Sequence, residues 1–275
     1  MKQAAFIGAG SMGGALIRAA CRAVGAEQVV FTDRDAAKAS ALAEELGCEC
    51  VPDNESAAAG ARFIFLCVKP QLLQMVLSGL LPVLERCSRA GEEKVLVSIA
   101  AGVQTSTIRG WLGDLADELP VVRVMPNTCA AIGQGMLALC ASPDVKEEYL
   151  AGAASILAQA GRVERLEEYL MDQFTAVAGC GPAYVYQLIE ALADGGVLVG
   201  LPRKQAQAYA AQTVLGAAAM VLECGEHPGA LKDAVCSPGG STIAGVAALE
   251  RCGFRSAAIQ AVKAAYEKNR ELGNS

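Results

Sequence analysis

The first half of the chain alternates short, β-branched apolar runs with longer segments rich in Ala, Leu, Glu and Lys. Apolar runs of this length predict buried strands, and the longer segments predict helices that cross over the sheet. The runs that fit strands cover residues 4–7, 29–32, 63–68, 95–99, 121–125 and 135–140. The segments that fit helices cover residues 11–24, between the first and second of these runs, and 36–46, between the second and third. The alternation predicts an α/β fold with a doubly wound parallel sheet and right-handed crossovers.

The pattern changes at about Glu164, where β-branched runs stop and Ala, Leu, Gln and Glu dominate. This composition predicts an all-α second half, with helices over residues 166–178, 183–199, 203–223, 229–235, 243–251 and 254–272. Pro and Gly stand at several of the expected helix ends, as they do in real helices. We therefore predict a domain boundary near Arg162, with an α/β domain over residues 1–162 and a helical domain over 163–275.

The predicted helix over residues 203–223 is apolar or small on almost every face. Such a helix is expected to be buried, and a domain of about 110 residues can hardly bury several of them alone. We therefore predict that a second copy of the chain covers part of this domain. A compact monomer with an Ala-rich core is the alternative.

Composition narrows the range of partners and compartments. With 23 basic against 29 acidic residues the formal net charge is −6, so no broad positive field attracts a nucleic acid. The eleven cysteines mostly lie in apolar runs and their number is odd, which argues against a complete disulfide framework. Charges, Gly or Pro interrupt each apolar stretch before membrane-spanning length, and the first residues lead directly into a strand rather than a signal peptide. We expect a cytoplasmic protein with no membrane or nucleic-acid partner.

Gly8, Gly10 and Gly13 form a G-x-G-x-x-G motif between the first predicted strand and the first predicted helix. In this setting the first glycine permits a tight turn, the second admits a pyrophosphate, and the third lets helix and strand pack closely. The helix N-terminus would offer free amides and a positive dipole end to the phosphates. Asp33 lies 20 residues after Gly13 (33 − 13), where an adenine ribose is expected. The motif predicts a dinucleotide cofactor.

The identity of that cofactor stays open at the end of the second predicted strand. Asp33 would accept hydrogen bonds from a ribose diol and repel a 2′-phosphate, which favours NADH. The neighbouring Arg34 could pair with that phosphate, which favours NADPH.

Other candidate site residues follow later strands. Ligands of open α/β sheets lie beyond the carboxyl ends of the strands, so Lys69 and the small residues 98–102 would lie at that edge. A solvated loop lysine is the alternative for Lys69. Residues 123–128, reading R-V-M-P-N-T, place polar side chains at the end of a further strand.

The segment 237–242, reading S-P-G-G-S-T, precedes a predicted helix in the second half. Its backbone amides and hydroxyls would suit a small carboxylate, although a simple helix cap is an equally good local interpretation. The chain has a single histidine, His227, no Tyr followed by Lys four residues on, and no recognisable zinc ligand set. A hydride acceptor that is already protonated, such as a cyclic iminium ion, requires no such proton donor.

Along nearly its whole length the sequence resembles the pyrroline-5-carboxylate reductase family. The similar segments are residues 6–13, 67–70, 100–103, 123–128, 179–184, 191–197, 200–203 and 253–255, and most specifically 227–243, reading H-P-G-A-L-K-D-A-V-C-S-P-G-G-S-T-I. The resemblance implies an N-terminal Rossmann-type sheet followed by a C-terminal all-α dimerisation domain. It also implies reduction of 1-pyrroline-5-carboxylate to L-proline, the last step of proline biosynthesis, by a homodimer that can assemble into a decamer.

The resemblance also implies site residues. For the cofactor, NADPH with NADH as the alternative, these are Ile7, Gly8, Ala9, Gly10, Ser11, Met12, Thr32, Asp33, Arg34, Asn54, Val68, Lys69, Pro70, Ile99, Ala100 and Ala101. For the substrate they are Ser237, Gly239, Gly240, Ser241 and Thr242, with the Thr242 hydroxyl toward the ring nitrogen as the residue closest to the chemistry. Many relatives carry Asn or Ser in place of Asp33, so the cofactor preference stays open.

Two other functions compete with this interpretation. A 3-hydroxyacid dehydrogenase shares the Rossmann and helical plan and would use a lysine such as Lys232, but the sequence around it matches the reductase loop. A dinucleotide-binding regulator without turnover would keep the three motif glycines and would need no loop like residues 237–242.

Overall fold

The structure, a computed structural model, describes residues 1–142 and 144–273. The chain forms two compact units. The first comprises Met1–Cys180 together with Ala265–Ser275, and the second comprises Gly181–Ala264.

The first unit is built on an eight-stranded sheet in the order β3-β2-β1-β4-β5-β6-β7-β8. Its strands are β1 (Lys2–Ile7), β2 (Val29–Thr32), β3 (Glu49–Cys50), β4 (Ala61–Leu66), β5 (Val95–Ser98), β6 (Val121–Met125), β7 (Gly135–Ala141) and β8 (Gly161–Arg165). Strands β1 to β6 pair in parallel, β7 is antiparallel to β6, and β8 is parallel to β7. The order 3-2-1-4-5-6 of the parallel part is that of a dinucleotide-binding doubly wound sheet, which confirms the predicted fold class.

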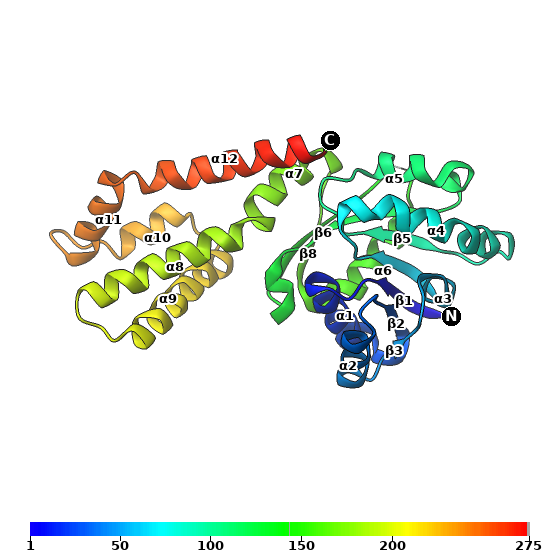
Figure 1. The fold of residues 1–275 in the computed structure, drawn as a ribbon. Coiled ribbons are helices and arrows are strands. Elements are labelled where there is room, and N and C mark those ends of the chain that lie inside the picture. The colour runs from blue at the N-terminus through cyan, green and yellow to red at the C-terminus, as the bar shows by residue number, and fades with distance from the viewer. Residues whose placement is uncertain (143, 274–275) are drawn as a thin grey trace. The chain divides into compact units, whose positions relative to one another are not determined.

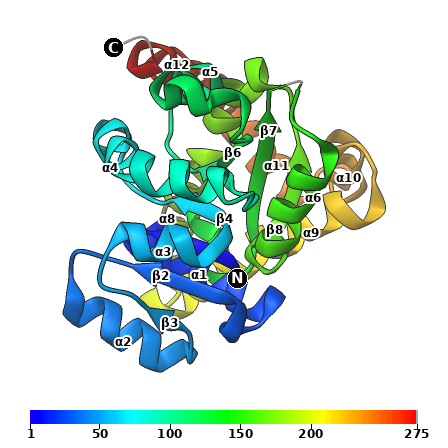
Figure 2. The ribbon, with the colours of Figure 1, turned by 90° about the vertical axis from the view of Figure 1, so that its right-hand side faces the viewer.

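Helices cover both faces of this sheet. They are α1 (Ser11–Val24), α2 (Ala36–Leu46), α3 (Asn54–Gly60), α4 (Pro70–Arg89), α5 (Thr105–Leu112), α6 (Glu147–Leu157) and the short α7 (Met171–Phe174). Alternate residues of each strand point to opposite faces, so one face packs against α1 and α6 and the other against α4 and α5. Figure 2 shows α6 beside β8, near the end of the sheet.

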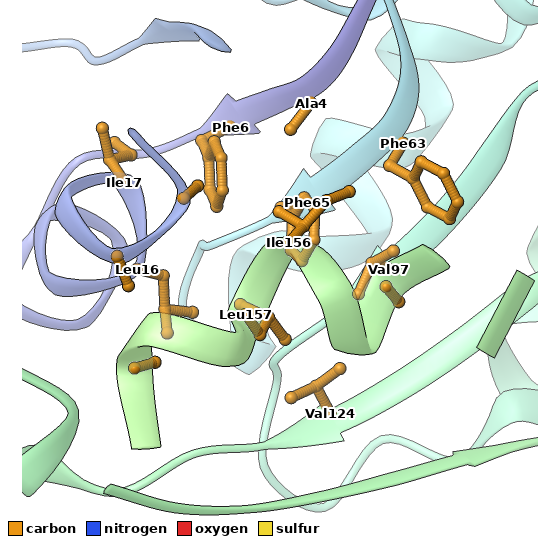
Figure 3. Packing of buried hydrophobic residues seen from close by; sticks show 14 of the residues in the cluster. Ala4, Phe6, Leu16, Ile17, Phe63, Phe65, Val97, Val124, Ile156 and Leu157 are labelled. Atoms are coloured by element: carbon orange, nitrogen blue, oxygen red, sulfur yellow. The ribbon is translucent and has the colours of Figure 1, made fainter. Parts of the chain in front are cut away.

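The larger apolar core lies on the face covered by α1 and α6. Phe6 of β1 and Phe65 of β4 stack with ring centroids 4.5 Å apart, and both are fully buried. Figure 3 shows Leu16 and Ile17 of α1 and Ile156 and Leu157 of α6 around these rings. This packing fixes the start of α1 against the end of β1, where the glycine motif lies.

Several predicted elements match the structure and others do not. The two predicted helices of the first half and the strands over residues 29–32 and 121–125 coincide with α1, α2, β2 and β6. The continuous helix predicted over residues 166–178 is wrong, because the segment contains a 3-10 turn (Glu168–Leu170), the short α7 and a π-helical turn (Thr175–Gly179). Strands β3 and β8 were not predicted.

The predicted domain boundary near Arg162 falls within β8, and the first unit continues to Cys180. The unit continues past the change in composition because β8 extends the sheet and the turns after it pack beside β7. The assignment of separate roles to residues 1–162 and 163–275 stays a prediction.

The second unit contains helices and no strand among the described residues. They are α8 (Gly181–Leu198), α9 (Arg203–Cys224), α10 (Pro228–Ala234), α11 (Ser241–Arg251) and the first part of α12 (Phe254–Gly273). Helices α8 and α9 lie side by side in Figure 1, joined through small residues at Ala193, Ala206 and Ala210. These three are the buried apolar residues of the unit's described part, so its own core is small.

Large apolar side chains of this unit are exposed instead. The most exposed on α8 and α9 are Tyr186, Leu198, Tyr209, Leu215 and Leu222, and Leu215 and Leu222 are 60% and 73% exposed. Apolar surface of this extent is unusual for a monomer and marks a protein interface.

Candidate active site

The three glycines of the turn after β1 have different surroundings. Gly8 has φ +100°, and a Cβ there would lie 2.6 Å from the carbonyl oxygen of Cys67. A Cβ on Gly13 would lie 2.1 Å from the carbonyl oxygen of Gly8. A Cβ on Gly10 would meet no atom of the protein within 4 Å. The first and third glycines are therefore required by packing, whereas the second leaves open space in front of the turn, as a bound pyrophosphate would need.

The N-terminus of α1 opens onto this space. Gly10 is its N-cap, and no side chain of the described residues caps it. The amide groups of the first turn, which includes Ser11 and Met12, are therefore available to an anion, and the helix dipole favours negative charge there. The turn fits the phosphates of a dinucleotide on this chain's own geometry.

Hydrogen bonds join the turn to the strands on either side of β1. The amide of Gly8 donates to the carbonyl of Thr32 at 2.9 Å, and the amide of Cys67 donates to the carbonyl of Ile7 at 2.9 Å. The amide of Ala9 donates to Oδ2 of Asp33 at 2.6 Å. The turn is thus held by the carboxyl ends of both neighbouring strands, β2 and β4.

The other predicted cofactor residues lie at the same edge of the sheet. Residues 68–70 follow β4 and residues 99–101 follow β5, and both strands are parallel to β1. Lys69 is the exposed N-cap of α4, Arg34 is exposed after β2, and Asn54 begins α3 after β3. The structure therefore brings the predicted cofactor residues to one edge, in the order of their strands.

Cys67 lies directly behind the turn, with its Cβ 3.1 Å from the position of a Cβ on Gly13. Burial in apolar surroundings raises the pKa of the Cys67 thiol well above its usual range. The side chain remains a neutral thiol and acts as a packing residue rather than a nucleophile.

The predicted substrate loop lies in the second unit and can be described within that unit. Gly239 has φ +68°, and a Cβ on Gly240 would lie 2.4 Å from Oγ of Ser237, so the loop turns tightly around that hydroxyl. Helix α11 begins at Ser241 with Gly240 as its N-cap, and no described side chain caps it. The loop is therefore not a side-chain helix cap, and its first-turn amides are free for a carboxylate.

His227 and Lys232 have local partners in the same unit. Nδ1 of His227 accepts a hydrogen bond from the amide of Gly229 at 3.0 Å, which makes the histidine the N-cap of α10. The ammonium of Lys232 pairs with its neighbour Asp233. Neither contact gives these side chains a catalytic geometry.

Arg123 begins the R-V-M-P-N-T segment and is 3% exposed in the middle of β6. Its Nη1 lies 3.3 Å from Oε1 of Glu168, and Glu168 also accepts hydrogen bonds from the amide and hydroxyl of Thr105. Arg123 and Glu168 border a polar cavity of about 360 Å³. A charged residue inside an apolar strand was the one sequence signal that could have pointed to this cluster.

Asn127, in the same motif, joins three segments of the first unit. Its side-chain amide donates to the carbonyl of Ala178 in the π-helical turn at 2.9 Å, and its side-chain oxygen accepts from the amide of Met136 at 3.3 Å. The sequence alone could not have shown this contact, because Asn127 and Ala178 are 51 positions apart.

The strand order, the glycine turn and the free helix N-terminus together define a dinucleotide-binding fold. With the comparisons that follow, they place the chain in the class of NAD(P)-dependent oxidoreductases. Residues 3–102 match the family model for NADP oxidoreductases dependent on coenzyme F420, and residues 168–272 match the model for pyrroline-5-carboxylate reductase dimerisation. The chain belongs to the pyrroline-5-carboxylate reductase family.

Curated relatives and solved structures agree with this assignment over the whole chain. Pyrroline-5-carboxylate reductase of Synechocystis is 43% identical over 98% of both chains, and that of Escherichia coli is 39% identical over 100% of this chain and 99% of its own. The Coxiella burnetii enzyme superposes with a TM-score of 0.89 at 31% identity, covering 98% of each chain. The Plasmodium falciparum enzyme with NADP bound superposes with a TM-score of 0.86 at 31% identity, covering 99% of this chain and 98% of that one.

Proposed function

We propose that the protein reduces 1-pyrroline-5-carboxylate to L-proline with NADPH as the hydride donor, the last step of proline biosynthesis. The observation that carries this proposal is the 39–43% identity to reductases of that name over essentially the whole chain. Similarity of this extent covers both the glycine turn and the loop over residues 237–242. The relative solved with NADP bound supports NADPH as the cofactor.

In this proposal residues 1–162 hold the cofactor and residues 163–275 provide dimerisation and the substrate loop. The pyrophosphate lies against Gly10 and the first-turn amides of α1. Residues 32–34 and Asn54 face the adenosine, and residues 68–70 and 99–101 face the nicotinamide, as their positions along the sheet edge suggest.

The substrate carboxylate is bound by the loop that precedes α11. The free amides after Gly240 and the helix dipole favour an anion there. Thr242 is exposed in the first turn of α11, and we assign its hydroxyl to the ring nitrogen as a positioning partner. Ser237, Gly239 and Ser241 shape the loop around the carboxylate.

No proton donor is needed for this reaction if the substrate binds as the iminium ion. The reduced nicotinamide supplies the hydride when bound. The task of the protein is then to hold the ring and the cofactor in a reactive geometry and to exclude water. The sole histidine is a helix cap, which is consistent with a reaction that does not use it.

We also propose that the functional unit is a homodimer, which can assemble into a decamer, and that it works in the cytoplasm. The exposed apolar side chains of α8 and α9 and the match to a dimerisation family model support the dimer. Among the described residues, no helix is both long enough and apolar enough to span a bilayer.

The test is oxidation of NADPH and NADH by the purified protein, followed by absorbance of the reduced nicotinamide with and without 1-pyrroline-5-carboxylate. We expect oxidation that depends on the substrate and is faster with NADPH. A folded protein that oxidises neither cofactor in the presence of the substrate would refute the proposal. Where oxidation depends on the substrate, chiral chromatography of the product distinguishes L-proline from another cyclic amine.

A further inference from the structure

The carboxylate of Asp33 already has two partners in the backbone of its own unit. Its Oδ2 accepts a hydrogen bond from the amide of Ala9 at 2.6 Å, and its Oδ1 accepts from the amide of Asp35 at 2.9 Å. The side chain therefore points back into the glycine turn. A residue at this position that selects NADH would instead direct its carboxylate to the hydroxyls of the adenine ribose.

The bond to Ala9 forms part of a two-point attachment. The amide of Gly8 donates to the carbonyl of Thr32, and the next amide, that of Ala9, donates to the side chain of Asp33. Hydrogen bonds to an ionised carboxylate are short and strong, and the 2.6 Å distance fits that class. A carboxylate oxygen has capacity for a further hydrogen bond, but turning the group toward a ligand would weaken its hold on the turn.

Arg34, the next residue, is in the opposite situation. It is exposed, and among the described residues no carboxylate pairs with its guanidinium. The nearby Asp35 is engaged elsewhere, because its side chain pairs with Lys38 at 3.1 Å and accepts from the amide of that residue. A free guanidinium beside an inward-turned carboxylate favours an added phosphate on the ribose.

We propose that Asp33 is a positioning residue that anchors the glycine turn for either dinucleotide and does not select between NADH and NADPH. The inference rests on the proposed function, since it concerns the cofactor of that same site. It explains how a chain with an acid after β2 can use a cofactor with a 2′-phosphate. The presence of Asp33 is then no argument for NADH.

The test compares dissociation constants of NADPH and NADH, measured by calorimetry on the full-length protein at about 0.15 M ionic strength to limit long-range charge effects. Asp33→Ala should weaken both cofactors by a similar factor, about tenfold, because one charge-assisted hydrogen bond is lost. The ratio of the two constants should change by less than about threefold. Asp33→Asn keeps an acceptor for Ala9 and should weaken both less.

Asp35→Ala is the matched control, because it also removes one carboxylate but leaves the Ala9 to Asp33 hydrogen bond in place. We expect dissociation constants close to those of the unmodified protein. Hydrogen exchange of the Ala9 amide gives a second readout that needs no cofactor. The exchange should become faster in Asp33→Ala and stay slow in Asp35→Ala.

Two outcomes would overturn the inference. The first is Asp33→Ala weakening NADH more than tenfold while NADPH binds equally or more tightly, which would make Asp33 a ribose selector. The second is an unchanged rate of hydrogen exchange of the Ala9 amide in Asp33→Ala, which would show that Asp33 does not anchor the turn. A protein that binds neither dinucleotide would refute the proposed function, and the exchange measurement would still decide the role of Asp33.

Discussion

Two glycines of the turn after β1 show how one motif combines two different requirements. Gly13 has no room for a methyl group, since a Cβ would collide with the carbonyl of Gly8. Gly10 has room within the protein, so its lack of a side chain is needed only when something else approaches the turn. Packing and ligand binding can therefore be separated by mutation.

We predict that Gly13→Ala lowers the free energy of unfolding by about 1–3 kcal/mol, as overpacking does. Gly10→Val should change it by no more than about 1 kcal/mol and should abolish dinucleotide binding, because the new side chain occupies the open space. Denaturant unfolding and calorimetric titration with NADPH measure the two effects. Retained NADPH affinity in Gly10→Val would contradict the phosphate site.

A substitution of Thr242 tests the proposed role of the substrate loop. We predict that Thr242→Ala lowers kcat/KM for 1-pyrroline-5-carboxylate by about 10- to 100-fold, through loss of one positioning hydrogen bond, and leaves the dissociation constant of NADPH unchanged. Thr107→Ala, at another exposed threonine in the first turn of a helix, is the control and should behave as the unmodified protein. Unchanged specificity in Thr242→Ala would place the ring nitrogen elsewhere.

At the scale of elements, a polar contact fastens α6 to the sheet. The hydroxyl of Tyr149 donates to Oε1 of Glu93, just before β5, at 2.5 Å. This bond holds the pKa of the Glu93 carboxyl below its usual range and raises that of Tyr149 to about 12. The carboxylate form of Glu93 and the neutral form of Tyr149 are therefore favoured in the folded protein.

We predict that Tyr149→Phe lowers the free energy of unfolding near neutral pH by about 1 kcal/mol. Because the pKa of Tyr149 is raised, the hydrogen bond contributes fully to the free energy of unfolding below pH 10. This contribution is lost as the pH rises toward about 12. The lowered pKa of Glu93 makes its contribution disappear as pH falls through the carboxyl range. In urea unfolding experiments, the difference in the free energy of unfolding between the unmodified protein and Tyr149→Phe should therefore vanish at high pH and at low pH. Tyr169→Phe, at a 75% exposed tyrosine, is the control and should have the same free energy of unfolding as the unmodified protein at every pH.

At the scale of the whole molecule, the second unit leaves most of its large apolar side chains exposed. We predict a mass of at least twice that of the chain in sedimentation equilibrium. Leu215→Glu, in the middle of α9, should dissociate the assembly, because a carboxylate would be buried without a partner. Met75→Glu changes a comparably exposed residue of α4 and should leave the mass unchanged. A monomeric unmodified protein would contradict the dimer.

The sequence was informative where function or structure depends on local spacing. The glycine motif, the apolar strands and the Gly-rich loop before α11 could all be recognised from neighbouring residues. Strand β8 could not, because at the edge of the sheet it carries Arg162, Glu164 and Arg165 in place of an apolar run. The hydrogen bonds between Asp33 and Ala9 and between Asn127 and Ala178 join segments that are distant in the sequence. They depend on where each side chain points in the folded chain, which no local pattern encodes.

The hydrogen bonds around the glycine turn also bear on how the chain folds. They join residues 7–9 to residues 32–33 on one side and to residue 67 on the other. Closing these loops costs entropy before any contact repays it, so the turn reaches its final shape only after β1, β2 and β4 have docked. A newly made chain therefore lacks the proposed dinucleotide site until more than sixty residues are in place. Once formed, the site makes the cofactor a stabiliser of the native state by mass action, in proportion to its concentration in the cell.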